Sequence, residues 1–241
     1  MSKVNVDTIE PQSASTLTLG GSGDTVTLGS GASASGFDSG LASVQTFTSS
    51  GTWTRPSGIT KVIMEVQGAG GSGSGSPNGE DCNGGAAGGY AKKFLDVSSI
   101  STSTITVGAG GAGVEGASGV INAGNDGGFS KWADGTNTIT ANGGDGGSLS
   151  HYAGTEGATA TGGDINIQGG DGWSIEYSAY TGSRGGFSFL GTGGHGKGYG
   201  KSTSGWPPRG YGAGSGSVSN WSSSYTSDTG GAGIVIVWEY K

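Results

Sequence analysis

The chain has 241 residues, of which 57 are glycine, and a formal net charge of −7 at pH 7. Leu, Ile, Val and Phe make up under a fifth of the residues, as in disordered chains, but so small a net charge and 20 aromatic residues favour an ordered core. The acidic balance argues against nucleic-acid binding, no apolar run is long enough to enter and cross a membrane, and Cys82, the single cysteine, excludes an intrachain disulfide.

Residues 1–43 are predicted to form a separate segment. The sequence Thr16–Gly20 returns as Thr25–Gly29, and both copies alternate polar and apolar residues as half-buried strands do. Strands this short cannot enclose their apolar side chains within one chain, whereas three chains around an axis could, which predicts a homotrimer. A disordered Ser/Gly tail is the alternative. The candidate trimerisation residues are Val4, Val6, Ile9, Leu17, Leu19, Val26 and Leu28.

Residues 44–241 are predicted to form a second, glycine-rich domain that contains β-strands and no useful helix. Residues 44–48 and 51–54 resemble one strand, which a proline turn at residues 55–58 ends. Residues 61–67 predict another strand, and residues 234–240, which are apolar on both faces, predict a strand in the middle of a sheet. Weaker strand patterns occupy residues 91–97, 104–107 and 138–141.

Glycine-rich stretches lie between these strands, over residues 68–89, 108–128, 143–172 and 182–233. Gly110, Gly113, Gly116 and Gly119 keep a three-residue spacing. A polyproline II helix has three residues per turn, so this spacing gives it a bare backbone ridge that can bond to a neighbour. Collagen is excluded by the broken period and the five prolines. The predicted fold class is all-β with irregular glycine-rich structure, in which short β-strands cap a bundle of polyglycine or polyproline II helices.

Several blocks of the chain resemble the glycine-rich domain of bacteriophage tail fibre proteins. They begin with Phe47-Thr48-Ser49-Ser50-Gly51-Thr52-Trp53-Thr54-Arg55-Pro56 and end with Gly230-Gly231-Ala232-Gly233-Ile234-Val235-Ile236. Residues 1–33 are similar to the first residues of tail fibre proteins from marine phages, including those of cyanobacteria. The resemblance implies a trimeric virion fibre, made in the host cytoplasm, that docks on other tail or baseplate proteins through residues 1–43. In related adhesins, polyglycine II helices stack into a sandwich whose terminal loops contact the host receptor.

Residues 173–225 hold half of the aromatic residues, and between Glu176 and Asp228 the only charged side chains are basic. Recognition surfaces use Tyr, Trp and Arg, sugar faces stack on aromatic rings, and phosphates favour Arg and Lys. This pattern predicts receptor binding to a host glycan or protein, although the aromatic residues could instead seal the ends of the bundle. The candidate receptor-binding residues are Tyr180, Arg184, His195, Tyr199, Trp206, Arg209, Tyr211, Trp221 and Tyr225.

Motifs for catalysis, cofactors or metals are weak. There is no Gly-x-Ser-x-Gly elbow, and the spacing before Gly200-Lys201-Ser202 is one residue too long for a phosphate loop. The aspartates of Gly162-Gly163-Asp164 and Gly169-Gly170-Asp171 suggest calcium repeats, but not at the nonapeptide spacing, and turn aspartates are the alternative. We therefore expect a non-enzymatic adhesin without cofactor or metal. A purely structural fibre such as a collar or whisker, a glycan depolymerase and a disordered wall protein are the alternatives.

Overall fold

The structure is a computed structural model that describes residue 30 and residues 40–76, 82–116, 121–150, 154–174, 182–198, 206–219 and 225–241. By its contacts the chain divides into two units, Met1–Ser39 and Gly40–Lys241. The seven N-terminal residues proposed for trimerisation, and the repeat that contains four of them, lie outside the described residues, so these hypotheses and the predicted boundary at residue 43 stay predictions. Within the described ranges the protein is all-β, without any helix and therefore without a helix able to cross a membrane.

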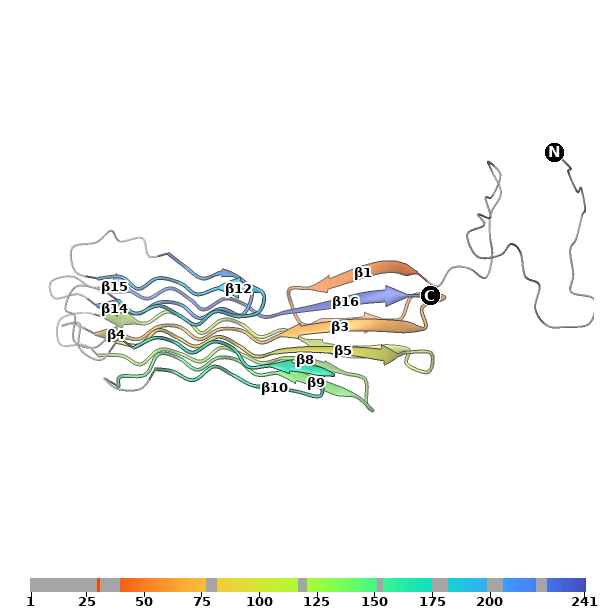
Figure 1. Ribbon diagram of the computed structural model, residues 1–241, viewed down its shortest axis with the longest axis horizontal. Helices are drawn as coiled ribbons and strands as arrows, with labels where there is room; N and C mark the ends of the chain where they lie inside the picture. The colour runs from red at the N-terminus through yellow and green to blue at the C-terminus, as the bar shows by residue number, and fades with distance from the viewer. Residues whose placement is uncertain are drawn as a thin grey trace, which may run out of the picture. The chain divides into compact units, whose positions relative to one another are not determined.

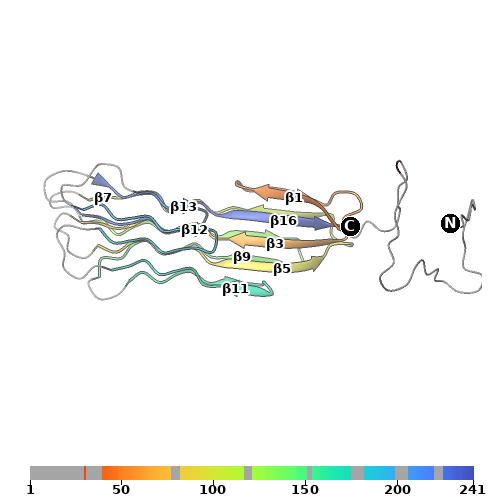
Figure 2. The same cartoon turned by 45° about the horizontal axis from the view of Figure 1, so that its top comes forward.

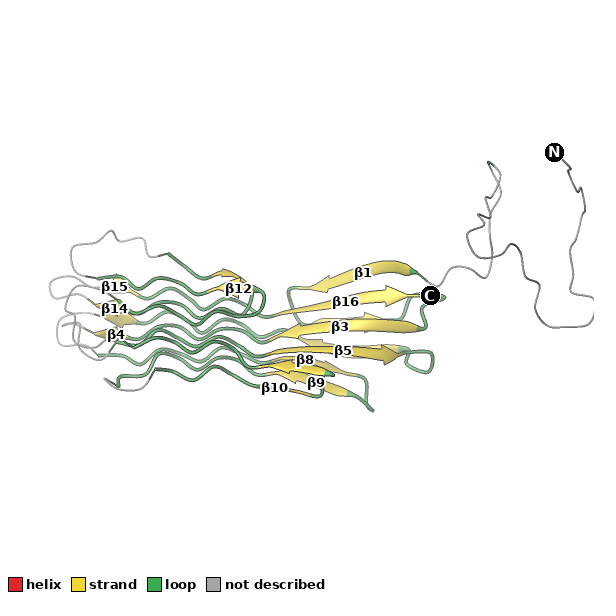
Figure 3. Ribbon diagram, in the orientation of Figure 1, coloured by secondary structure: helices red, strands yellow, loops and turns green. Residues whose placement is uncertain are grey.

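Two five-stranded antiparallel sheets pack face to face at one end of the Gly40–Lys241 unit (Figures 1 and 3). The first sheet has the order β1 (Leu41–Phe47), β16 (Ile234–Tyr240), β3 (Lys61–Gln67), β5 (Tyr90–Asp96) and β11 (Ile165–Ile167). The second has the order β10 (Ala160–Thr161), β9 (Thr138–Ala141), β8 (Ser130–Ala133), β6 (Thr102–Thr106) and β2 (Gly51–Thr54). Together they form a sandwich and not a closed barrel.

The strands at residues 61–67 and 234–240 are confirmed, and β16 lies inside the first sheet between β1 and β3. The weaker predictions correspond to β5, β6 and β9 within two residues at each end. The prediction that residues 44–48 and 51–54 form one strand is wrong. β1 pairs with β16 and β2 pairs with β6, so the chain bends at Thr48 and Ser49 and changes sheets. The proline turn is present, with Gly58 at φ +80°.

A small apolar core fills the space between the two sheets. Every second side chain of β3 points toward the second sheet, namely those of Val62, Met64 and Val66. There they join the same core as Trp53 and Trp132, whose two ring centroids lie 4.9 Å apart. The burial alternates because successive side chains of a strand point to opposite faces. The apolar residues at positions 62, 64 and 66 are therefore the ones that face the second sheet.

Glu239 is a buried carboxylate on the inner face of the first sheet. It accepts hydrogen bonds from Ser43 Oγ at 2.5 Å, Gln45 Nε2 at 2.7 Å and Trp53 Nε1 at 2.7 Å. Three donors compensate for the loss of hydration that burial of a carboxylate entails. Because Trp53 belongs to β2, Glu239 joins the two sheets as well as fixing the edge strand β1.

A glycine-rich bundle extends from one end of the sandwich (Figures 1 and 2). It consists of residues 68–76, 82–89, 108–116, 121–129, 142–150, 154–159, 168–174, 182–198, 206–219 and 225–233. Its only regular elements are two-residue strands: β4 (Gly75–Ser76), β7 (Glu115–Gly116), β12 (Gly191–Thr192), β13 (Arg209–Gly210), β14 (Val218–Ser219) and β15 (Tyr225–Thr226). Most of these segments begin or end at a strand of the sandwich, so the sandwich sets their positions. Residues 182–198 and 206–219 instead contain short turns of their own.

The segment of residues 68–75 shows how the bundle is bonded. The N–H groups of Gly68, Gly71 and Ser74 donate to residues 83–89 at 2.9–3.0 Å. Those of Ala69, Ser72 and Gly75 donate to residues 122–128, also at 2.9–3.0 Å. The N–H of Gly70 donates to Gly231 O at 2.8 Å. The first two of these directions therefore recur every third residue, whereas a β-strand has a period of two.

The carbonyl groups of the same segment follow the same period. Those of Ala69 and Ser72 accept from the N–H groups of Gly144 and Gly147 at 2.8 and 2.7 Å. Those of Gly71 and Ser74 accept from Ser215 and Val218 at 3.0 and 2.9 Å, and Gly70 O accepts from Gly111 at 3.0 Å. The segment is therefore bonded to six neighbouring segments, with Gly75 O accepting from Asn122 N at 2.9 Å and Gly73 N donating to Ser215 Oγ at 2.9 Å in addition.

This bonding requires that the backbones approach without intervening side chains. A Cβ added to Gly70 would stand 2.1 Å from Ala213 O, and one added to Gly110 would stand 1.8 Å from Gly230 O. Both distances are far below van der Waals contact, so no other residue fits at these positions without displacing backbone. Glycine here supplies close approach, while the left-handed backbone conformation that also favours glycine is confined in the bundle to Gly210 and Gly212.

Replacement of Gly70 by Ala tests this requirement. The new methyl group collides with the backbone of Ala213, so we expect a loss of about 1–3 kcal/mol of unfolding free energy or more. Gly51→Ala is the matched control, because its Cβ would meet only the Phe47 ring at 4.0 Å. The measurement is the midpoint of thermal unfolding for both variants. Equal midpoints for the two variants would contradict the requirement for a bare backbone.

Candidate functional site

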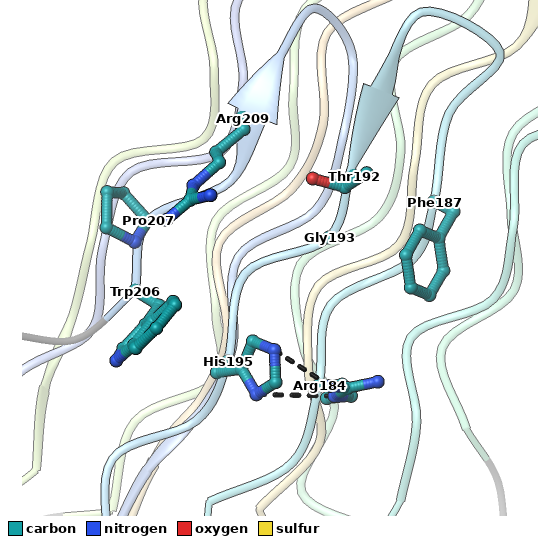
Figure 4. A pocket seen from close by; sticks show the side chains of 8 residues that line it. All are labelled: Arg184, Phe187, Thr192, Gly193, His195, Trp206, Pro207 and Arg209. Carbon is teal, nitrogen blue, oxygen red and sulfur yellow. Dashed lines mark hydrogen bonds between the residues drawn. The ribbon is translucent and has the colours of Figure 1, made fainter.

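Four of the predicted receptor-binding residues line one cavity on the side of the glycine-rich bundle. They are Arg184, His195, Trp206 and Arg209, and the cavity has a volume of about 230 Å³ (Figure 4). Phe187, Thr192, Gly193 and Pro207 complete the lining. We call it the Arg184–Trp206 cavity.

Two backbone pairings bring these side chains together. Gly191 and Thr192 of β12 pair with Gly210 and Arg209 of β13, and His195 N donates to Trp206 O at 3.0 Å. On the other side, Gly185 N donates to Gly194 O at 2.9 Å, which sets the Arg184 segment beside the His195 segment. A Cβ on Gly193 would stand 1.9 Å from Gly185 O, so glycine is needed to bring the two segments together.

The Arg184 guanidinium group contacts the imidazole ring of His195. Arg184 Nη2 lies 2.8 Å from His195 Nε2, and Arg184 Nε lies 3.3 Å from His195 Nδ1 (Figure 4). A neutral imidazole has one accepting and one donating nitrogen, so both contacts cannot be hydrogen bonds from the arginine at once. Arg184 Nε donates to Nδ1, and the role of Nε2 depends on the tautomer of the ring. An imidazole carries no negative charge in any protonation state, so this contact gives Arg184 no counterion.

Trp206 forms the opposite wall of the cavity and is 61% exposed. The Arg209 guanidinium carbon lies 5.4 Å from its ring centroid, within the range of a cation–π contact. The His195 ring centroid lies 5.8 Å from it at an interplanar angle of 53°. A large apolar side chain so exposed gains little from burial, so two polar neighbours rather than a core determine its position.

No carboxylate lines the cavity. Ion pairs among the described residues include Lys92–Glu65 at 3.5 Å, Lys93–Asp164 at 3.3 Å and Lys197–Asp228 at 3.3 Å. Lys197, one of the basic residues that drew attention to this segment, is therefore neutralised by Asp228. Arg184 and Arg209 are not in contact with an acid in the part of the chain that the structure describes, so their charges face the cavity uncompensated.

The remaining predicted residues lie elsewhere. Tyr211 is half-buried in the turn beside β13, where its carbonyl group accepts from Ser188 Oγ. Tyr225 belongs to β15 and pairs with Gly116 of β7, away from the cavity. Tyr180, Tyr199 and Trp221 fall outside the described residues. Sequence reasoning omitted three side chains of the lining. Phe187 belonged to the aromatic cluster that it identified, and Pro207 follows the predicted Trp206, whereas nothing in the pattern distinguishes Thr192 from the other threonines.

The aspartates that suggested calcium repeats have structural partners. Asp164 accepts a hydrogen bond from Phe94 N at 2.9 Å and forms an ion pair with Lys93. The hydrogen bond from Phe94 N lowers the pKa of Asp164, and Lys93 lowers it further. Asp171 Oδ1 accepts from Gly157 N at 2.9 Å. Among the described residues, no three His, Cys, Asp or Glu side chains gather as metal ligands would. Both carboxylates therefore bond to distant segments of the chain, whereas a turn aspartate bonds to the backbone of its own turn.

An acidic cavity of about 300 Å³ lies on another side of the bundle, lined by Asn142, Gly143, Asp145, Glu156, Gly157, Ala158 and Thr159. Burial raises the pKa of Asp145, and the charges of Asp126 and Glu156 raise it further. No cationic side chain lines this cavity, so its electrostatics oppose those of the Arg184–Trp206 cavity.

Residues 43–240 fit a family model that describes a glycine-rich domain. The glycine-rich part of the sequence resemblance is thereby confirmed. No curated protein matches the chain.

Proposed function

The chain belongs to this family of glycine-rich domains, and from that premise we propose that it is a bacteriophage tail fibre adhesin. Its proposed role is to recognise a host-surface receptor, a glycan or an outer-membrane component. The observation that carries the proposal is the Arg184–Trp206 cavity. It presents an exposed indole ring and two uncompensated guanidinium groups on a support held by backbone hydrogen bonds. Exposed Trp and Arg on a rigid scaffold are typical of binding hot spots.

The proposed scaffold is a bundle of polyglycine II helices. Such a helix has three residues per turn and no internal hydrogen bonds, so all its N–H and C=O groups are available to neighbours. The three-residue period of the bonds from residues 68–75, and the six neighbours of that segment, support the proposal. A scaffold bonded in all lateral directions would hold recognition side chains with little loss of entropy on binding.

The proposed assembly is a homotrimeric virion fibre that joins other tail or baseplate proteins through residues 1–43. Support comes from the outer face of the first sheet, which carries Leu41, Val44, Phe94, Ile165 and Ile167 at exposures of 37–53%. Ile63, Ile236 and Trp238 extend this face in register with them. Its central charges, Glu65 and Lys92, pair with each other at 3.5 Å. Contiguous apolar surface of this kind marks interaction sites.

Host binding can be measured with a fluorescent fusion of the full chain on a panel of bacterial strains. We expect staining of a subset of strains and, on those, at least tenfold weaker binding by Trp206→Ala, because a hot-spot truncation costs about 2 kcal/mol. Trp173→Ala is the matched control, since Trp173 is 62% exposed on the bundle and does not line the cavity. Equal binding by the two variants, or staining of no strain, would favour a purely structural fibre.

The oligomeric state can be measured by light scattering coupled to size-exclusion chromatography. We expect a mass three times the 23.3 kDa of one chain. Phe94→Glu places a charge in the apolar outer face and should shift the mass toward the monomer, because burying an unpaired charge is unfavourable. Phe129→Glu is the control, as Phe129 is 47% exposed on the bundle. A monomeric wild-type protein would contradict the assembly.

A further inference from the structure

We propose that the Arg184–Trp206 cavity is a subsite for an anionic sugar, a single pyranose ring that carries a carboxylate or a phosphate. The ring lies against Trp206, and the anionic group binds Arg184. The proposal rests on the proposed function, since it specifies the ligand class of the receptor-binding surface.

Arg184 is the proposed anion ligand because its charge has no counterion among the residues that the structure describes. The guanidinium group has five N–H donors, and its contacts with His195 through Nε and Nη2 use at most two of them. The imidazole ring orients the arginine without supplying a negative charge. Planar guanidinium groups bind carboxylate and phosphate through paired, charge-assisted hydrogen bonds, and those of Arg184 face a cavity that contains no acid.

Trp206 is the proposed ring platform. Its exposed indole is a flat apolar surface of the kind on which the C–H face of a pyranose stacks, and Figure 4 shows it across the cavity from Arg184 and Phe187. Arg209 contacts the indole ring and pairs through its backbone with Thr192, so it is a positioning residue that also adds positive potential. The Thr192 hydroxyl lines the same space and can bind a sugar hydroxyl.

The size of the cavity limits the ligand. At about 230 Å³ it is smaller than the ~300–1,000 Å³ of typical small-molecule sites, so it accommodates one ring and not an oligosaccharide. An uncharged sugar would leave the charge of Arg184 desolvated and without a counterion, which costs free energy. The charge, the flat platform and the size together favour a monosaccharide unit with one anionic group over a neutral sugar.

Binding of isolated sugars to the full chain can be followed by saturation-transfer NMR and titration. The probes are galacturonic acid and glucose 6-phosphate, which distinguish the carboxylate from the phosphate, with galactose and glucose as neutral counterparts. Acetate and inorganic phosphate test for binding of the ion alone. We expect at least one acidic sugar to bind tenfold or more tightly than its neutral counterpart and than the free ion. Equal affinity for acidic and neutral sugars, or for the free ion, would overturn the proposal.

Single substitutions test the proposed roles of Arg184 as anion ligand and Trp206 as ring platform separately. Arg184→Gln should remove the preference for the acidic sugar, and Trp206→Ala should weaken acidic and neutral sugars alike, while Trp173→Ala should change neither. Unchanged thermal unfolding shows that each variant is folded. An unchanged preference in folded Arg184→Gln, or binding of a polyglutamate peptide but of no sugar, would overturn the proposal.

Cell staining distinguishes this proposal from the proposed function. If the chain stains cells, and saturating galacturonic acid and glucose 6-phosphate do not reduce the staining, the anionic-sugar subsite is wrong and the adhesin proposal stands. If the sugars bind as expected but no cell is stained, the subsite stands and the adhesin proposal is wrong.

Discussion

The structure depends on direct contact between backbones. Gly85 and Gly214 illustrate it: a Cβ on Gly85 would stand 2.2 Å from Gly71 O, and one on Gly214 would stand 1.9 Å from Gly85 O. Each segment thus fits only against another bare segment. The compensation is that N–H and C=O groups bond between segments, and each such bond contributes a net ~0.5–1.5 kcal/mol. A chain with so few large apolar residues therefore replaces much of the usual side-chain core with backbone hydrogen bonds.

The sandwich and the bundle are parts of one bonding scheme. At Gln67 the chain passes from a strand, whose side chains repeat every two residues, into a bundle segment whose hydrogen bonds repeat every three. Gln67 Nε2 lies within 2.9–3.2 Å of the carbonyl oxygens of Gly68, Gly88 and Gly89. This buried side chain connects outgoing and returning segments where the first sheet ends. The buried positions of the bundle are mostly Gly, Ala and Ser, with Cys82, Asn83 and Val218 as larger exceptions, so the longest side chains of the glycine-rich segments lie on its surface. Arg184, His195 and Trp206 reach the solvent for that reason, and the proposed recognition site follows from the packing rule.

The periods of the strands and of the glycine-rich segments could be predicted from the sequence, but which segments lie next to one another could not. The apolar runs located the strands at residues 61–67 and 234–240, and the three-residue spacing of Gly110 and Gly113 corresponds to contacts with Gly230 O and Ser227 O. The pairing of Gly68, Ala69 and Gly70 with three different segments was not predictable, since Gly and Ala carry no side chain that specifies a partner. Likewise, composition indicated Arg184 and Trp206, but the contact of Arg184 with His195 and the place of Thr192 depend on register between distant segments.

Residue-resolved hydrogen exchange over residues 68–75 tests the central claim most directly. Every N–H in this run donates to another segment, to a carbonyl group or, for Gly73, to Ser215 Oγ at 2.9 Å. The account predicts strong protection at all eight consecutive amides, near the free energy of global unfolding. Protection that alternates between neighbouring residues would indicate an ordinary strand, and exchange at the rate of an open loop would show that the backbone bonds do not hold the bundle together.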